Sequence, residues 1–192
     1  MARRPDPGAR ERILEAASQL FAEHGIHAVG LQQIIDACGC GKNLLYREFG
    51  SKDDLVVAHL ERCRRDWEDA FDAAAGAHPH DVAAQLVAVV ATVAEDVGGN
   101  GFRGCSLRNA FSEFPDPGHP ARKTIIQQYT ERQERLRDLA TRADLRDPHR
   151  VADRIALIID GLNANGPVLG DKGAAAEALA FAEDVISAAR RP

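Results

Sequence analysis

The sequence predicts an all-α protein of about nine helices. Apolar residues recur every three or four positions along most of the chain, which is the spacing of one helix face. Groups of glycine, proline and aspartate interrupt these stretches, as at residues 76–81 and within 98–120. With 192 residues, 45% of them hydrophobic, the chain is long enough to bury a substantial core.

The N-terminal stretch predicts a scaffold helix over residues 9–23. Its apolar residues keep a helical spacing, Asp6 and Pro7 suit an N-cap and first turn, and Gly25 suits a stop. Three arginines, Arg3, Arg4 and Arg10, come before or at its start. They belong either to a solvated tail or to a basic arm that follows a DNA groove.

Two short helices, near residues 32–37 and 42–49, are expected on either side of a turn at Gly39, because glycine can adopt positive φ. Ser51, with Asp54 three residues later, predicts the capped start of a helix that runs from Lys52 into the seventies. A helix, a tight turn and a second helix form the pattern of a DNA-reading helix-turn-helix.

This segment resembles the TetR family of transcriptional regulators. Nine residues stand at the spacing of the family signature: Ala37, Gly39, Lys42, Leu45, Tyr46, Phe49, Ser51, Lys52 and Leu55. The resemblance is strong over residues 9–55. It implies a DNA-binding domain over residues 1–50 and a ligand-binding and dimerisation domain over 51–192. It further implies a ligand-responsive regulator, a repressor rather than an enzyme, that binds palindromic operator DNA as a homodimer and is released by a small, mostly apolar effector.

Side-chain chemistry and the resemblance together suggest the DNA contacts. Lys42 can reach a phosphate or a guanine edge, Asn43 can pair with adenine, and Leu44 can touch a thymine methyl. The expected DNA-binding residues are Lys42, Asn43, Leu44, Tyr46, Arg47, Lys52, Gln32 and Gln33. Four residues depart from the family pattern: Gly30, Ile35, Gly41 and Leu44.

Five further helices are expected after the long helix that begins at Lys52. Asp81 and Asp147 are each placed to cap a helix start, and Asn163 to Pro167 should end the second of these helices. The remaining helices are expected over residues 106–114, 120–143 and 173–189. One face of the helix over 120–143, with Arg132 and Arg135, is charged and expected to face solvent.

Aromatic and polar residues of the second domain predict an effector cavity with a few directing groups, although an ordinary core with satisfied polar residues is the alternative. The candidate ligand-binding residues are Trp67, Phe71, Phe102, Cys105, Asn109, Phe111, Tyr129 and Asn163. In the TetR family the last two long helices pair with their copies. The residues implied for that dimer interface are Ile155, Ile158, Ile159, Leu162, Leu179, Ala182, Val185 and Ile186, and the alternative is packing within one chain.

Other classes of protein are disfavoured or left as rivals. No apolar run approaches ~20 residues and no apolar signal segment starts the chain, so we expect a cytoplasmic protein without a membrane span. The net charge of −5 decides little, since residues 1–65 hold ten basic and nine acidic side chains. No cofactor is expected. A helical adaptor without DNA binding, a small helical enzyme, and a thiol- or metal-sensing protein remain rivals. The last would use Cys38, Cys40, Cys63 or Cys105.

Overall fold

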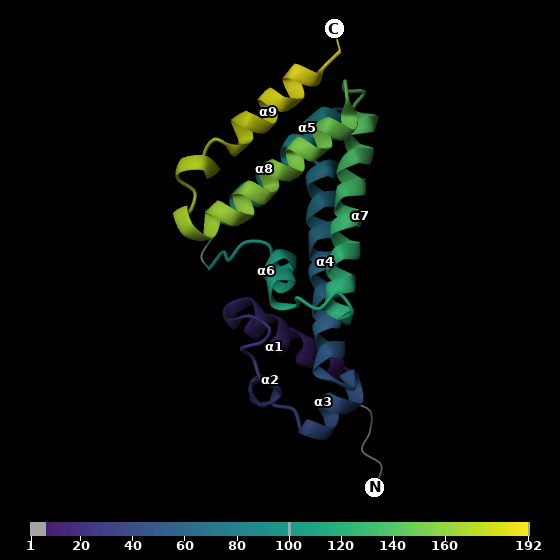
Figure 1. Ribbon diagram of the computed structural model, residues 1–192, viewed down its shortest axis with the longest axis vertical. Helices are drawn as coiled ribbons and strands as arrows, with labels where there is room; N and C mark the ends of the chain where they lie inside the picture. The colour runs from purple at the N-terminus through teal and green to yellow at the C-terminus, as the bar shows by residue number, and fades with distance from the viewer. Residues whose placement is uncertain (1–6, 100, 192) are drawn as a thin grey trace. The chain divides into compact units, whose positions relative to one another are not determined.

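The computed structural model describes residues 7–99 and 101–191 (Figure 1). Within these residues the protein is all-α and has no strand, so the predicted fold class is confirmed. The elements are α1 (Ala9–His24), α2 (Leu31–Cys38), α3 (Lys42–Phe49), α4 (Lys52–Gly76), α5 (Val82–Val97), α6 (Ser106–Glu113), α7 (Pro120–Arg142), α8 (Pro148–Leu169), a 3-10 turn η1 (Gly173–Ala175) and α9 (Ala178–Ala189).

The chain divides into two compact units. The N-terminal unit comprises the residues up to Arg64 together with Ser106–Ile125, and the C-terminal unit comprises Arg65–Cys105 together with the residues from Ile126 onward. The helices α4 and α7 therefore each contribute residues to both units. The compact N-terminal unit thus includes α6 beside the first three helices. The division into a DNA-binding and a ligand-binding domain after residue 50 stays a prediction.

The core of the N-terminal unit explains why its short helices are stable. α1 packs against both α2 and α3, which are too short to persist alone. Each of them contributes a fully buried apolar side chain, Ile34 from α2 and Leu45 from α3, and α1 contributes further buried residues such as Ile13 and Phe21. Burying side chains of this size contributes about 1.5–3 kcal/mol each.

Two of the predicted helix caps are confirmed, at the starts of α4 and α5. The Ser51 hydroxyl accepts from the Asp54 N–H at 3.1 Å, and the Asp81 carboxylate accepts from the Ala84 N–H at 3.0 Å. The predicted start of α8 is confirmed, with Asp147 at the N-cap and Pro148 in the first turn, but Asp147 adopts the left-handed conformation and its side chain makes no cap hydrogen bond. Asp6 lies outside the described residues, and Gly8 occupies the N-cap of α1.

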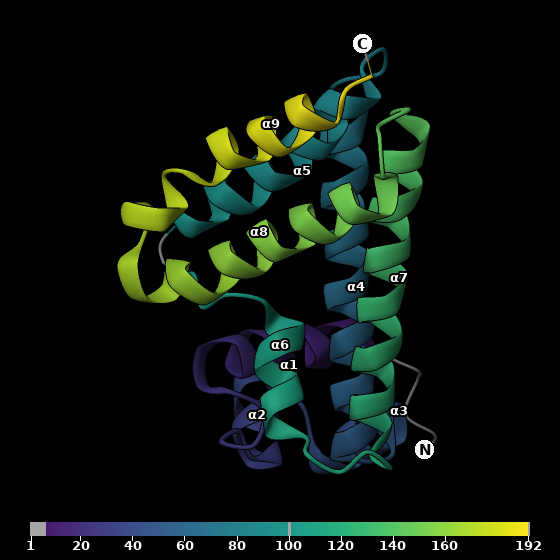
Figure 2. The ribbon, with the colours of Figure 1, turned by 45° about the horizontal axis from the view of Figure 1, so that its top comes forward.

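In the C-terminal unit α5, α8 and α9 pack on one another (Figure 2). The predicted end of α8 at residues 163–167 was wrong, since the helix continues through Pro167 to Leu169. Proline at position 167 has no N–H for the carbonyl of Asn163. Gly104, at φ 81°, lies so close to that carbonyl that a Cβ on it would stand 2.4 Å from the oxygen. The carbonyl that Pro167 leaves without a partner in the helix is therefore the one that Gly104 approaches.

The last helix is shorter than predicted. The stretch expected to be helical from residue 173 begins with η1, and α9 starts only at Ala178. At its other end, the Arg146 N–H donates to the carbonyl of Ala189 at 2.8 Å and the Arg146 guanidinium donates to that of Ala188 at 2.6 Å. These bonds satisfy two of the carbonyls that a helix leaves unpaired at its C-terminus.

Candidate DNA interface and effector region

The turn between α2 and α3 has the geometry that the sequence predicted. Gly39 takes the left-handed conformation at φ 62° and its N–H donates to the carbonyl of Ile35, which ends α2. Gly41 is the N-cap of α3 and offers no side chain to the first N–H groups of that helix. Buried Leu45 and Phe49 fix the inner face of α3 in the unit.

The outer face of α3 presents polar side chains. Lys42, Asn43 and Tyr46 are exposed, and Leu44 is half-buried. The Lys42 ammonium lies 5.9 Å from the centre of the Tyr46 ring, so the two side chains share one surface. Three of the predicted DNA-binding residues are therefore on one exposed face of a short, supported helix.

The other predicted DNA-binding residues already have partners within the N-terminal unit. The Gln33 side-chain oxygen accepts from the Gly30 N–H at 2.7 Å, which compensates for the missing cap side chain at that position. Gln32 donates to Asp36 at 2.8 Å, and Arg47 pairs with Glu48 at 2.9 Å.

Lys52 is half-buried and its ammonium donates to the carbonyl of Ile26 at 2.8 Å. Burial lowers the pKa of Lys52, although the nearby carboxylates of Glu113 and Asp53 oppose this shift. In this structure Lys52 therefore ties the loop after α1 to the start of α4, and its predicted contact with a phosphate stays a prediction.

Arg10 is the one member of the suggested basic arm that the structure describes, because Arg3 and Arg4 lie outside the described residues. Its guanidinium donates to the carbonyl of Glu48 and lies 4.2 Å from the centre of the Phe49 ring. Arg10 thus joins the start of α1 to the end of α3.

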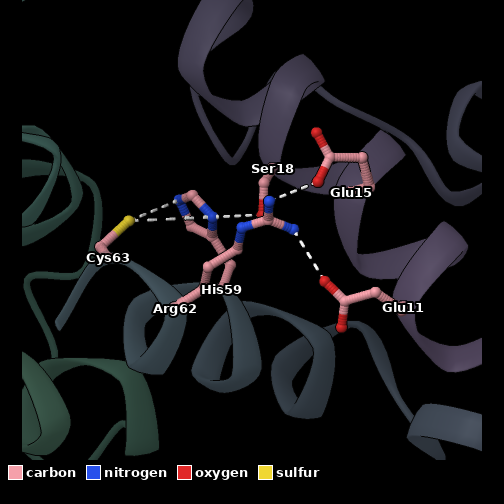
Figure 3. A network of polar contacts seen from close by, with 6 residues as sticks. All are labelled: Glu11, Glu15, Ser18, His59, Arg62 and Cys63. Atoms are coloured by element: carbon pink, nitrogen blue, oxygen red, sulfur yellow. Dashed lines mark hydrogen bonds and ion pairs between the residues drawn. The ribbon is translucent and has the colours of Figure 1, made fainter. Parts of the chain in front are cut away.

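A polar network joins α1 to α4 within the N-terminal unit (Figure 3). His59 is buried and its Nδ1 lies 2.9 Å from the Ser18 hydroxyl, while its Nε2 lies 3.7 Å from the Cys63 sulfur. Arg62, which directly precedes Cys63 on α4, pairs with Glu11 and Glu15. Burial, and secondarily the charge of Arg62, lowers the pKa of His59 to about 4, so the ring is neutral at pH 7.

Helix α6 is joined to the loop between α1 and α2 by one carboxylate. Glu113 accepts from the backbone N–H groups of Ile26 and His27 at 2.9 and 2.6 Å. The His27 Nε2 atom donates to the backbone carbonyl of Glu113 at 2.7 Å, and the centre of the His27 ring lies 4.8 Å from that of the Phe114 ring. These contacts explain why α6 belongs to the N-terminal unit, and Glu113 was not among the functional residues predicted from the sequence.

The structure brings together only part of the predicted effector site. In the C-terminal unit the rings of Trp67 and Phe71 are tilted against each other with their centres 5.1 Å apart, and the Tyr129 hydroxyl lies 3.9 Å from the Cys105 sulfur. Asn109 and Phe111 are exposed residues of the N-terminal unit.

Phe102 and Asn163 lie elsewhere in the C-terminal unit, along α8. Phe102 packs at Gly166, where a Cβ would stand 2.8 Å from its ring, and the Asn163 amide donates to the carbonyl of Ile159 at 3.0 Å. The eight candidates therefore do not form one cluster.

Arg132 was assigned to a solvated face, and that expectation was wrong. Its guanidinium lies 4.7 Å from the centre of the Trp67 ring and donates to the Cys105 sulfur at 3.7 Å. Arg135 likewise lies 4.3 Å from the centre of the Phe71 ring, and it pairs with Asp72. Both arginines cover apolar rings with their planar heads. The signal in the sequence was the spacing, because Arg132 follows Tyr129 by three positions on one helix face.

Most residues assigned to the dimer interface are buried within one chain. The buried members are Ile155, Ile158, Leu162, Ala182, Val185 and Ile186. Ile159 is half-buried and Leu179 is 36% exposed. The inward side of α8 and α9 therefore packs within its own unit, and the dimer interface stays a prediction.

The same two helices carry exposed apolar side chains. Leu157 on α8 is 70% exposed and Phe181 on α9 is 57% exposed. Both line a groove of about 360 Å³ between α8 and α9. Sequence periodicity could not separate this outer face from the buried one, since each helix is apolar on more than one side.

The four cysteines are free thiols, and the described residues contain no group of three or more His, Cys, Asp or Glu side chains placed for a metal ion. Burial, with the neighbouring Cys38 thiol, raises the pKa of Cys40 to about 11, which keeps that thiol protonated and unreactive. None of the helices in the described part is both long and apolar enough to span a membrane.

Comparisons with known proteins agree with this architecture. The model of the bacterial regulatory proteins of the tetR family matches residues 13–59. The transcriptional activator FasR of Mycolicibacterium smegmatis is 42% identical over 60 residues, which span 31% of this chain and 27% of that protein. The transcriptional regulator YjdC of Escherichia coli is 26% identical over 182 residues, covering 94% of this chain and 95% of that one.

Among solved structures, a TetR-family transcriptional regulator from Streptomyces coelicolor superposes with a TM-score of 0.89 at 29% identity, over 95% of this chain and 96% of that one. The likeness therefore extends through both compact units and is not confined to the helix-turn-helix. These matches identify residues 13–59 as a regulatory domain of the tetR family, and they show that the chain is similar to TetR-family transcriptional regulators over nearly its whole length.

Proposed function

We propose that this regulator is a cytoplasmic homodimer that represses transcription by binding palindromic operator DNA, and that a small effector releases it. The observation that supports DNA reading is the exposed face of α3. Lys42, Asn43 and Tyr46 point away from a helix whose opposite side is fixed by buried Leu45 and Phe49. A helix presented in this way can enter the major groove.

Each side chain of that face has a distinct proposed role. Lys42 binds a phosphate or the O6 and N7 atoms of guanine, and Asn43 pairs with adenine. The Tyr46 hydroxyl donates to a phosphate, and half-buried Leu44 contacts a thymine methyl. Arg47 and Lys52 join the interface only if they exchange their present partners, Glu48 and the carbonyl of Ile26, for DNA phosphates.

A mobility shift with the DNA upstream of the gene tests this proposal. Binding that resists competitor DNA and weakens steeply with salt supports a specific regulator. The double variant Lys42→Ala, Tyr46→Phe should bind at least about tenfold more weakly, because two contacts of about 1 kcal/mol or more are lost. Lys172→Ala is the matched control, since it removes an exposed lysine from the loop at η1. Unchanged affinity of the double variant would refute the assignment.

The proposed dimer uses the outer face of α8 and α9. Two copies that meet there would bury Leu157 and Phe181, which are exposed in the single chain. Light scattering should show that Leu157→Ser, Phe181→Ser is a monomer. Ile126→Ser on α7 is the control, because Ile126 is also an exposed large apolar side chain. A double variant that stays dimeric would place the interface elsewhere.

Effector release requires that the ligand bind one state of the dimer better than the other. A coupling of about 1–3 kcal/mol is enough to change operator occupancy by roughly 5–150-fold. Reporter expression with and without the regulator tests the sign of control. Higher expression without it supports repression, whereas lower expression would make this protein an activator, as FasR is described.

A further inference from the structure

We infer that the effector is an aromatic carboxylate whose anionic group binds Arg132 and Tyr129 in the C-terminal unit. This rests on the proposed function of that unit as the effector-binding domain. It also changes the expected ligand, since the sequence suggested a mostly apolar molecule. Two hydrogen-bond donors of this unit, from Arg132 and Tyr129, converge on one weak acceptor.

The Cys105 sulfur receives both donors. The Arg132 guanidinium lies 3.7 Å from it and the Tyr129 hydroxyl lies 3.9 Å from it. A cysteine sulfur is a weak acceptor, whereas a guanidinium and a phenol are among the strongest donors that a protein has. A carboxylate places two oxygens within reach of such a pair, and charge-assisted bonds to it are shorter and stronger than bonds to sulfur.

Arg132 has a charge that no carboxylate of the described residues balances at ion-pair distance. Its Nε atom is buried and has no hydrogen-bond partner, which is a costly state for a polar group. The neighbouring Arg135 provides the contrast, since it covers the same ring of Trp67 at 5.8 Å but pairs with Asp72. Of the two arginines that cover Trp67, Arg132 is therefore the one without a carboxylate partner.

Tyr129 is suited to donate its proton rather than to lose it. Burial raises the pKa of its hydroxyl, and the nearby Cys105 and Asp160 add to this shift. At neutral pH the phenol is therefore protonated, so it can donate to an anion but does not repel one.

The surroundings favour an aromatic body on the ligand. Trp67 and Tyr129 are both half-buried, which leaves part of each ring accessible. Trp67 lies under the Arg132 guanidinium at 4.7 Å and beside Phe71 at 5.1 Å. A planar aromatic acid can place its carboxylate on the guanidinium while its ring packs against these side chains.

The test uses the fluorescence of Trp67, the single tryptophan of the chain. The full-length protein, without DNA, is titrated with benzoate and with benzamide, its neutral isostere. The expected result is a saturable change with benzoate and at least tenfold weaker binding of benzamide. Arg132→Gln should weaken benzoate binding at least tenfold, whereas Arg135→Gln should leave it within about twofold. Tyr129→Phe keeps the ring and should weaken benzoate binding several-fold.

Three results would overturn the inference: no saturable response to benzoate, equal binding of benzamide, or equal losses in the two arginine variants. Far-UV circular dichroism checks that each variant is folded, and Tyr129→Phe keeps the inference testable if Arg132→Gln does not fold. Because the titration contains no DNA, its failure would reject the anion site and leave DNA binding to be judged by the mobility shift. A failed mobility shift beside a positive titration would reject the regulator's proposed DNA reading and support this site.

Discussion

Lowering the pH from 7 to 5 should destabilise the N-terminal unit through one buried side chain, His59. This imidazole lies between Ser18 and Cys63, with its pKa lowered from 6.5 to about 4 (Figure 3). In the unfolded chain the same group returns to its ordinary pKa near 6.5. Between these two values the unfolded state binds more protons than the folded state, so stability falls as the pH falls.

The size of the effect follows from the two pKa values. Full protonation would cost about 3.4 kcal/mol, since each unit of difference corresponds to about 1.36 kcal/mol. Between pH 7 and pH 5 the loss is about 1.8 kcal/mol, because only the unfolded state is substantially protonated at pH 5. The charged side chain that acts on His59 is Arg62, which lowers the pKa of the imidazole further. Arg62 is itself paired with Glu11 and Glu15 on α1.

Urea unfolding followed by circular dichroism at 222 nm, at pH 7 and at pH 5, measures this loss. His59→Gln is the comparison, because glutamine can still bond to the Ser18 hydroxyl but does not titrate. The other six histidines and the carboxylates are the same in both proteins, so the difference between their pH dependences isolates His59.

Hydrogen exchange of α1 should locate the destabilisation, since Ser18 lies on that helix. Wild-type protein should lose about 1.8 kcal/mol more than the variant on going to pH 5. Equal losses in the two proteins would refute the reasoning.

Three further substitutions test the packing. Gly166→Ala should destabilise the C-terminal unit by about 1–3 kcal/mol, because the new Cβ would stand 2.8 Å from Phe102 and Val97; Gly161→Ala on the same helix, with open space around it, should be neutral or stabilising by thermal melting. Gly39→Ala should cost about 1–2 kcal/mol in urea unfolding, since its φ of 62° is left-handed, and a neutral outcome would show that the turn relaxes. Glu113→Ala should cost about 1–3 kcal/mol, mainly through the part-buried N–H of Ile26, because water can pair with the exposed N–H of His27, and it should speed hydrogen exchange at these two amides.

The helices themselves were largely predictable because their determinants are local. Ser51 and Asp81 cap helices through neighbours three residues away, and Gly39 ends α2 through its own backbone freedom. Asp147 occupies the N-cap of α8 as predicted, but it adopts a left-handed backbone conformation and its side chain makes no cap hydrogen bond.

The sites were less predictable, because a side chain's partner can come from far along the chain. Lys42, Asn43 and Tyr46 were identified correctly as a polar group on one helix, and the structure shows them exposed. Arg132 was assigned to solvent, since its sequence neighbours are charged, and only Trp67 and Cys105, which are 65 and 27 positions away, show otherwise.

By itself, the sequence determined the fold class, the helix-turn-helix and the family resemblance, because apolar spacing and turn residues act within a few positions. Only the tertiary structure decided which apolar face of α8 and α9 is buried, how α8 continues through Pro167, and which donors meet at Cys105. Those outcomes depend on loops and helices that approach from distant parts of the chain, such as Gly104 at the carbonyl of Asn163. The spacing of apolar residues along one helix does not show which distant loop or helix will pack against it.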